Sequence, residues 1–415
     1  MINAVASSTR SGRIRFVLIL GSLSALAPLS IDLYLPGLPE LSRELDASAA
    51  EVQLTLTSCL IGLALGQLLA GPLSDRLGRR RPLLVGLAAY AAASFACALS
   101  PTVYALVALR LVQGLAGAAG IVIARAIVRD LRSGAAAARL FSSLMLVTGL
   151  TPILAPIVGG QLLQVTSWRG LFVALAAAGV VLALATAAWL AETLPPEQRH
   201  GGSWHETMGT FRRLARDRVF VGYALVLGFA FGELLAYIAG SPFVIENLYG
   251  VSPRLFAIVF GVNSLGIVAC SQVNGLLVMR IDPQRLLAGG LVTGALGGVA
   301  LLAVTLAGIG LAGILPCLFV VVSSIGFVMP NATALAMTEL PHVAGSASAL
   351  LGVLQFVIGA AAAPLVGISG GRSAVPMAIV TATFGILGCV LLVLTRRAVR
   401  TPRSVPSTAR AGEEA

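Results

Sequence analysis

The sequence contains no lysine: all 28 basic residues of the 415-residue chain are arginine. Charge of either sign is scarce, because only 11% of the residues are charged while 57% are hydrophobic. Soluble globular domains carry about a quarter charged residues, and a water-soluble fold of this length could not hide so much apolar surface. The composition therefore excludes an ordinary soluble domain and predicts a chain that folds in a lipid bilayer.

Other absences limit the chemical functions that the chain can have. Without lysine no G-x-x-x-x-G-K-[ST] motif can exist, which excludes a P-loop nucleotide site. The five cysteines lie singly in apolar runs, as small buried side chains do. His200, His205 and His342 fall in expected loops, which does not favour a metal site. We expect no metal, no cofactor and no catalytic residue; an intramembrane enzyme, which needs clustered nucleophiles or metal ligands, is the unfavoured alternative.

Long uncharged runs mark the expected membrane spans, because ~20 apolar residues cross ~30 Å of hydrocarbon as a helix. The first run, Phe16 to Leu35, is too long for a signal peptide and has no clear cleavage site after it, so we expect a retained span. Twelve helices are predicted. They lie over residues 16–35, 52–74, 82 to the break at Ser100-Pro101, 102–124, 140–168, 170–191, 219–245, 255–279, two within 286–338 that turn near Gly308–Gly313, 343–371 and 373–395.

The long polar segment from Glu192 to Arg218 divides the chain into two halves of six spans. The expected organisation is an N-terminal six-helix bundle (1–191), a cytoplasmic central loop (192–218), a C-terminal six-helix bundle (219–396) and a disordered cytoplasmic tail (397–415). This all-α membrane architecture, with two equal halves, is typical of pseudo-symmetric transporters.

Arginine placement predicts the orientation. Alternate loops and both termini are rich in arginine, whereas the loops between them contain only Arg43, Arg169, Arg254 and Arg372. Because positive residues accumulate on the cytoplasmic side, both termini are expected in the cytoplasm, with the protein in the cell (inner) membrane. The same spread of charge argues against nucleic acid as a partner. The expected partners are the bilayer, protons and a small amphipathic substrate, and the protein is expected to be a monomer.

The segment Gly71-Pro72-Leu73-Ser74-Asp75-Arg76-Leu77-Gly78-Arg79-Arg80-Arg81 is the strongest local signal. Glycine permits a very tight turn between two spans, and an acidic side chain there can pair with arginine or cap a helix N-terminus. The alternative is a plain positive-inside anchor loop, which would need the arginines but neither the glycines nor the acid. The candidate gating residues are Gly71, Asp75, Arg76, Gly78 and Arg79.

This segment resembles motif A of the major facilitator superfamily, and Arg110-Leu111-Val112-Gln113-Gly114 resembles its fourth-span signature. Gly149, Pro152, Pro156 and Gly159 resemble the fifth-span antiporter motif, although Pro152 departs from the usual spacing. The chain is similar, more narrowly, to the Bcr/CflA family of drug:proton antiporters. The matching segments are Asp32–Pro39, Arg125–Asp130, Ser241–Val244, Pro330–Ala332 and Gly345–Ala349.

The resemblance implies the major facilitator fold, with two six-helix bundles around a central cavity. It also implies proton-coupled efflux of a drug or small metabolite by alternating access of that cavity to the two sides. A proton-coupled uptake permease of the same fold is an alternative that the sequence leaves open. Neither function requires a catalytic site.

Only Asp32, Arg110 and Glu233 place a charge within the predicted spans. Because a charge at the centre of a membrane helix costs at least ~2.5–3.5 kcal/mol, these three residues are the candidates for proton coupling. The resemblance implies an acidic coupling residue in the first span, where Asp32 is the match. The alternatives are an interfacial position for the two acids and, for Arg110, a structural tie to backbone carbonyls.

Polar residues at helical spacing supply the candidate substrate contacts. Arg110, Gln113, Gly114 and Gly117 share one face, suited to a cavity or to close packing. For each amide an interhelical hydrogen bond is at least as good an interpretation as a substrate contact. The candidate substrate-binding residues are Tyr34, Gln53, Gln113, Tyr237, Asn263 and Gln355.

Overall fold

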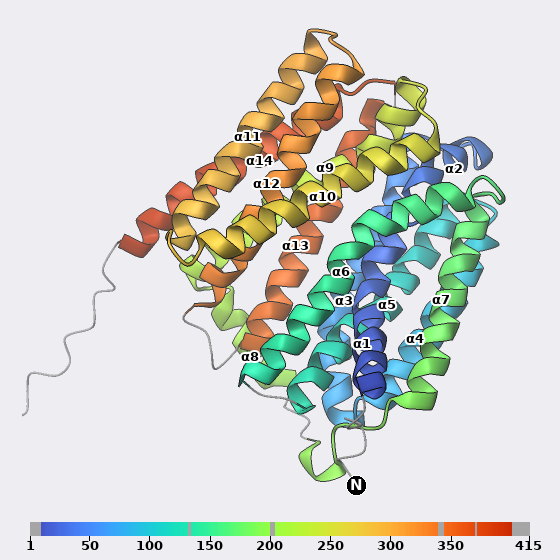
Figure 1. Ribbon diagram of the computed structural model, residues 1–415, viewed down its shortest axis with the longest axis vertical. Helices are drawn as coiled ribbons and strands as arrows, with labels where there is room; N and C mark the ends of the chain where they lie inside the picture. Colours follow the sequence, from blue (N-terminus) through green and yellow to red (C-terminus); the bar gives the residue numbers. More distant parts are fainter. Residues whose placement is uncertain (1–9, 132–133, 200–203, 339–343, 370–371, 401–415) are drawn as a thin grey trace, which may run out of the picture.

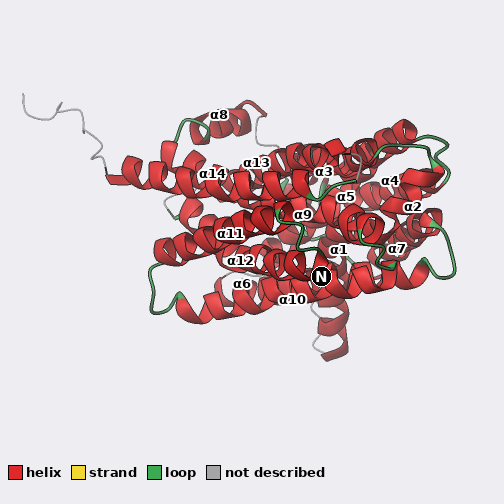
Figure 2. Cartoon of the chain, turned by 90° about the horizontal axis from the view of Figure 1, so that it is seen from above, coloured by secondary structure: helices red, strands yellow, loops and turns green. Residues whose placement is uncertain are grey.

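The computed structural model describes residues 10–131, 134–199, 204–338, 344–369 and 372–400, and within them it contains helices and loops but no strand (Figure 2). The twelve long helices of this part confirm the predicted fold class. They are α1 (Arg10–Asp32), α3 (Ala49–Leu77), α4 (Arg80–Ala98), α5 (Val103–Leu131), α6 (Gly134–Leu162), α7 (Trp168–Trp189), α9 (Arg218–Pro242), α10 (Pro253–Leu277), α11 (Pro283–Leu306), α12 (Leu311–Met337), α13 (Ala344–Val366) and α14 (Val375–Arg400).

Eleven of these helices are long and apolar enough to cross a membrane. The twelfth, α6, contains a shorter apolar stretch at Gly149–Leu162. Several boundaries differ from the prediction. The α5 helix continues to Leu131, past the predicted end at Ala124, because charged residues end a hydrophobic span without ending a helix. The α6 helix ends at Leu162 and α7 already begins at Trp168, whose apolar side chain had extended the predicted fifth span.

One predicted turn is confirmed, and the first span ends three residues before its predicted end at Leu35. The α1 helix ends at Asp32, just before the two prolines of the segment Leu35–Pro39, which continues as the 3₁₀ turn η2 (Leu35–Gly37) and the short helix α2 (Leu38–Glu44). The predicted turn within 286–338 lies between α11 and α12. Gly308 and Gly310 have φ angles of 66° and 84° there, in the left-handed region that glycine adopts without a steric penalty.

Short elements appear where the sequence suggested only loops. The predicted central loop contains the turn η3 (Pro196–Gln198) and the helix α8 (Trp204–Leu214), so His205 lies on a helix rather than in a loop. The π-helical turn η4 (Phe243–Leu248) follows α9, and the 3₁₀ turn η6 (Gly367–Ser369) follows α13. At the C-terminus α14 reaches Arg400, past the predicted start of the tail at 397, while 401–415 lie outside the described residues.

The helices form two bundles, α1–α7 and α9–α14, which Figure 1 shows side by side. In the first, α3 and α5 pack very closely because glycines line their contact. A Cβ atom at Gly62, Gly66 or Gly114 would lie only 2.1–2.4 Å from a backbone oxygen of the facing helix. Small residues in this arrangement let membrane helices approach each other.

The two bundles join along the pairs α3–α13 and α6–α10. We call the end of the molecule that holds α2 the α2 end, and the opposite end, with the α3–α4 turn, the motif end. Near the α2 end Gln53 Nε2 donates to the Ala239 carbonyl at 3.0 Å and Thr57 Oγ1 to the Ala360 carbonyl at 2.9 Å. Only about 10 Å³ of space remains beside Gln53. The bundles therefore meet at the α2 end and diverge toward the motif end (Figure 1).

Candidate functional site

Asp32 is the last residue of α1 and only 4% of its surface is exposed. The helix ends there because a following proline-containing turn cannot continue it. Next to it the Leu33 carbonyl touches Gly159 of α6, where a Cβ atom would lie 2.0 Å from that oxygen. A glycine of the fifth-span motif thus sets how closely α6 approaches the end of α1 that carries Asp32.

Across the boundary between the bundles, Asp32 lies within electrostatic reach of Tyr237 on α9. Asn263 Nδ2 of α10 donates to the Tyr237 hydroxyl at 2.9 Å, and the Tyr237 ring stacks on Phe260 at 5.2 Å between centroids. Tyr237 and Asn263 are buried. The structure therefore brings together three predicted site residues, one from the first bundle and two from the second.

Arg110 occupies a different place, inside the first bundle and fully buried. Its guanidinium carbon lies 4.5 Å from the centre of the Tyr34 ring and 5.5 Å from that of Phe172, a cation–π arrangement. It donates to the Gln113 side chain and to the Thr55 carbonyl, while Nη2 has no partner. Within the described residues no hydrogen bond or ion pair joins Arg110 to Asp32 or to any other carboxylate.

Two predicted substrate residues belong to this arginine's surroundings. The Tyr34 hydroxyl bonds with Thr55 Oγ1 at 2.9 Å, and Gln113 Nε2 donates to Ser94 Oγ at 2.6 Å. Both side chains are completely buried. The polar face that starts at Arg110 is thus a close-packed one, with the Gly114 backbone against α3 and its hydrogen bonds directed between helices.

Glu233 lies in the interior of the second bundle, with 2% of its surface exposed. Its carboxylate fits against two glycines of neighbouring helices: Cβ atoms at Gly294 of α11 and Gly385 of α14 would lie 3.3 and 3.1 Å from its oxygens. Oε1 has no hydrogen-bond partner. The structure thus turns Glu233 toward α11 and α14, although Tyr237, one turn further along α9, pairs with α10.

The remaining predicted residues lie on α3, α6 and α13, three of the helices through which the bundles join. Gln53 bonds across it to Ala239 near the α2 end, and Gln355 is half-buried on α13. In α6 the Pro152 carbonyl accepts a hydrogen bond from Ser264 of the second bundle at 3.2 Å. Pro156 lies one turn further along α6, and a Cβ atom at Gly149 would meet nothing within 4 Å.

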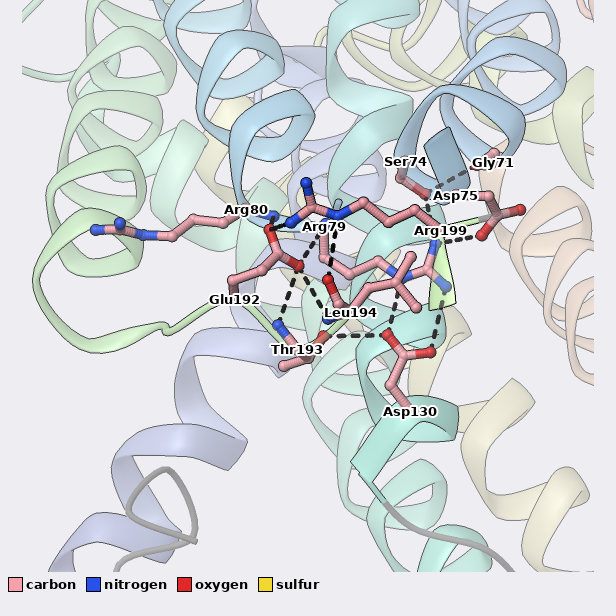
Figure 3. A network of polar contacts seen from close by, with 10 residues as sticks. All are labelled: Gly71, Ser74, Asp75, Arg79, Arg80, Asp130, Glu192, Thr193, Leu194 and Arg199. Carbon is pink, nitrogen blue, oxygen red and sulfur yellow. Dashed lines mark hydrogen bonds and ion pairs between the residues drawn. The ribbon is translucent and has the colours of Figure 1, made fainter. Parts of the chain in front are cut away.

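The motif end carries a dense polar network (Figure 3). Arg79, 7% exposed, is its centre. Its Nε and Nη2 donate to both oxygens of Asp130 at 2.8 and 3.2 Å, and its Nη1 to Asp75 and to Ser74. Two carboxylates from α3 and α5 therefore neutralise one buried guanidinium, and the fork of the guanidinium fixes their geometry.

Glu192 completes this network from the segment after α7. Its carboxylate accepts the backbone N–H groups of Arg79 and Arg80, at 2.8 and 3.1 Å, and thereby caps the start of α4. Partial burial raises the pKa of the Glu192 carboxyl, but the N–H groups of Leu194, Arg79 and Arg80 and the nearby Arg199 outweigh burial and lower it below its ordinary value.

The residues of the predicted gating motif take different positions in this network. Gly78 has a φ of 88° and lies against the Glu192 carboxylate, so its backbone and its lack of a side chain are both needed. Arg76 is exposed, and Gly71 contributes a carbonyl that accepts from Ser74. Sequence reasoning missed the roles of Asp130 and Glu192. The available signal was that Glu192 directly follows an apolar span and that Asp130 lies six residues after the predicted end of another at Ala124, both at the arginine-rich side.

Known proteins are similar to this chain over most of its length. The profile of the Major Facilitator Superfamily matches residues 20–364. A protein of Bacillus subtilis named "uncharacterized MFS-type transporter YdgK" is 42% identical over 92% of this chain and 95% of its own length. The bicyclomycin resistance protein homolog of Haemophilus influenzae is 31% identical over 94% and 97%, and a chloramphenicol resistance protein of Pseudomonas aeruginosa is 31% identical over 70% and 68%.

Solved structures share the fold at low sequence identity. An inward-facing, unoccupied bacterial homolog of the human lysosomal transporter Spinster superposes with a TM-score of 0.77 at 15% identity, covering 96% of this chain and 100% of that one. A D-xylose–proton symporter superposes with a TM-score of 0.73 at 14% identity, covering 92% and 97%.

Proposed function

This chain belongs to the major facilitator superfamily, a family of membrane transporters, and we propose that it exports drugs or small metabolites in exchange for protons. Relatives named for resistance to bicyclomycin and to chloramphenicol support export of a drug-like substrate. The observation that carries proton coupling is the position of Asp32: a buried carboxyl of the first bundle that lies within electrostatic reach of Tyr237 of the second.

The proposed coupling follows from the cost of burying a charge. With the bundles closed around Asp32 at the α2 end, the low-dielectric surroundings disfavour the carboxylate, and the protonated acid is the form that fits. When the bundles separate there, water solvates the carboxyl group and the carboxylate form is no longer disfavoured. Protonation therefore favours closure of the α2 end, and deprotonation favours its opening.

The orientation of the protein in the membrane determines the direction of the proposed transport cycle. The arginine bias supports a cytoplasmic motif end and an external α2 end, so that the described arrangement is inward-facing. A proton taken up from outside closes the α2 end, and its release to the cytoplasm accompanies substrate binding. Alternation between the two arrangements is a rocking of one bundle against the other.

The polar residues divide by their contacts. We assign Tyr237 and Asn263 to the substrate path because they lie near Asp32 of the other bundle. We add Gln355 because it is half-buried on α13, a helix that packs against α3 of the first bundle. Tyr34 and Gln113 support Arg110 inside the first bundle, and Gln53 seals the α2 end. Asp75 pairs with Arg79, yet its side chain is 51% exposed. We propose that it contacts the second bundle when the motif ends close and thereby holds the outward-facing state.

Glu233 is the second candidate proton carrier and Arg110 the residue that tunes the field around the site. The test is substrate and proton flux in proteoliposomes with an imposed pH gradient, using chloramphenicol first and a compound panel next. We expect Asp32→Asn to abolish accumulation driven by the gradient while substrate still equilibrates. Glu233→Gln and Arg110→Ala, measured in parallel, show whether either residue shares the role.

The matched control is Asp46→Asn, which removes an exposed carboxyl at the same end and suits the left-handed backbone of that residue (φ 48°). It should transport normally. If Asp32→Asn still accumulates substrate against a gradient, Asp32 does not carry the coupling. The side on which substrate accumulates separates export from uptake.

A further inference from the structure

A groove of about 370 Å³ opens on the second bundle, and its lining residues all belong to α10, α11 and α12. The α10 and α11 helices each pack against α12 and leave a strip of it uncovered between them. The floor of the groove comes from Phe319, Ser323 and Phe327 of α12, and one wall from Gly289 and Thr293 of α11. A bilayer leaves no such surface empty, because exposed apolar walls are in contact with lipid chains.

The shape of the groove follows from small residues. Gly289 is exposed, and a Cβ atom there would meet no other atom within 4 Å. Gly290 lies beside it, against Phe327 and Val328. Two consecutive glycines thus recess the wall of α11 where other membrane helices carry bulky side chains, and the lining of the recess is mainly apolar, as an acyl chain requires.

The end of the groove at the motif end is positively charged. Arg285, in the first turn of α11, lines it and is exposed. Its backbone N–H donates to the Asp282 carbonyl, and within the described residues its guanidinium has no hydrogen bond or ion pair. Arg280 is exposed just before this turn, and Arg396 of α14 donates to the Gln284 carbonyl next to Arg285. The one acid of this turn, Asp282, is engaged as the N-cap of α11 through the Gln284 N–H.

We propose that this groove binds one anionic phospholipid, with an acyl chain along α12 and the phosphate at Arg285. The apolar recess fits the chain, and the free guanidinium at the membrane edge fits the charge of the headgroup. The N-terminus of α11 adds a favourable field for a phosphate at the same place. The site lies on the cytoplasmic leaflet if the motif end is cytoplasmic, and its occupancy does not depend on the transported substrate.

The test is native mass spectrometry of the purified full chain titrated with phosphatidylglycerol and, separately, with phosphatidylcholine. Wild-type protein should retain one phosphatidylglycerol more tightly than phosphatidylcholine. Arg285→Gln should weaken phosphatidylglycerol binding about fivefold, the equivalent of about 1 kcal/mol for one basic residue at an anionic membrane surface. Gly289→Leu, which fills the recess, should weaken both lipids.

Matched controls are Arg254→Gln, which removes an exposed arginine in the first turn of α10, at the α2 end and away from the groove, and Gly275→Leu, which replaces an exposed glycine of α10 that also has open space around it. Both should bind like wild type, and unfolding midpoints show that all four variants fold. Inorganic phosphate alone should not compete. Equal retention of both lipids by wild type, or an unchanged phosphatidylglycerol affinity in Arg285→Gln, overturns the proposal.

Discussion

At the scale of single residues, Glu192 shows how one carboxylate can organise a turn that lies far from it in sequence. It accepts the N–H groups of Arg79, Arg80, Thr193 and Leu194. We expect Glu192→Gln to lower the free energy of unfolding by about 1 kcal/mol, as loss of a helix N-cap does. The midpoint of thermal unfolding in detergent measures it, and Glu197→Gln, an exposed acid nearby, is the control.

The pH dependence of this effect has a definite sign. The pKa of Glu192 is lowered in the folded protein, so its carboxylate stabilises the fold above the ordinary pKa of 4.5, and this contribution is lost as the pH falls through the lowered value. Wild type and Glu192→Gln should therefore differ at neutral pH and converge in acid. A difference that persists unchanged below that range would mean that charge is not the cause.

Arg110, unlike Glu192, is a buried charge with no oppositely charged partner in the described part of the chain. An unpaired ion in the interior costs several kcal/mol, whereas leaving the Gln113 oxygen without its donor costs about 1–3 kcal/mol. We therefore expect Arg110→Met to keep or raise the unfolding midpoint while transport falls at least about tenfold. Stability and proteoliposome flux are measured on the same preparation. A clear loss of stability would favour the structural tie instead of a functional charge.

At the scale of elements, one helix contains two glycines with opposite expected responses. Gly159 lies against the Leu33 carbonyl, so Gly159→Ala must push α6 away from the end of α1, at a cost of about 1–3 kcal/mol. Gly149 has open space, and Gly149→Ala should stabilise the helix by about 0.5–1 kcal/mol. Unfolding midpoints measure both, and transport should fall only in Gly159→Ala. Equal responses would contradict the close approach at Leu33.

The same elements show what the sequence could predict. Helices, their number and the turn at Gly308 followed from apolar length and glycine, because the bilayer allows few other structures. The contacts between side chains on different helices could not be predicted from the sequence. Asp130 meets Arg79 across 51 residues, and Arg110 and Asp32 lie apart although both are charges in spans, because the packing of helices decides which faces meet. Glu233 and Tyr237 share a helical face, yet their side chains reach different neighbouring helices.

At the scale of the whole molecule, the contact at the α2 end is the feature that alternating access must break. Gly367 of η6 lies so close to α3 that a Cβ atom would be 2.6 Å from the Ala50 Cα and would also displace the Gln53 amide. Backbone cannot yield there as a flexible side chain can, so Gly367→Ala should prevent full closure of this end. If the bundles move as rigid bodies, the motif end must close in compensation.

The expected result is a change of opposite sign at the two ends. Spin labels replace exposed residues in a background without the native cysteines: Val165 with Ile309 at the α2 end, and Trp189 with Met279 at the motif end. In Gly367→Ala the first distance should lengthen and the second should shorten, whereas Gly275→Ala, an alanine placed in open space, should change neither. Lengthening at the α2 end with no change at the motif end would show local loosening and refute rigid rocking. No change at either end would mean that η6 is not part of the seal.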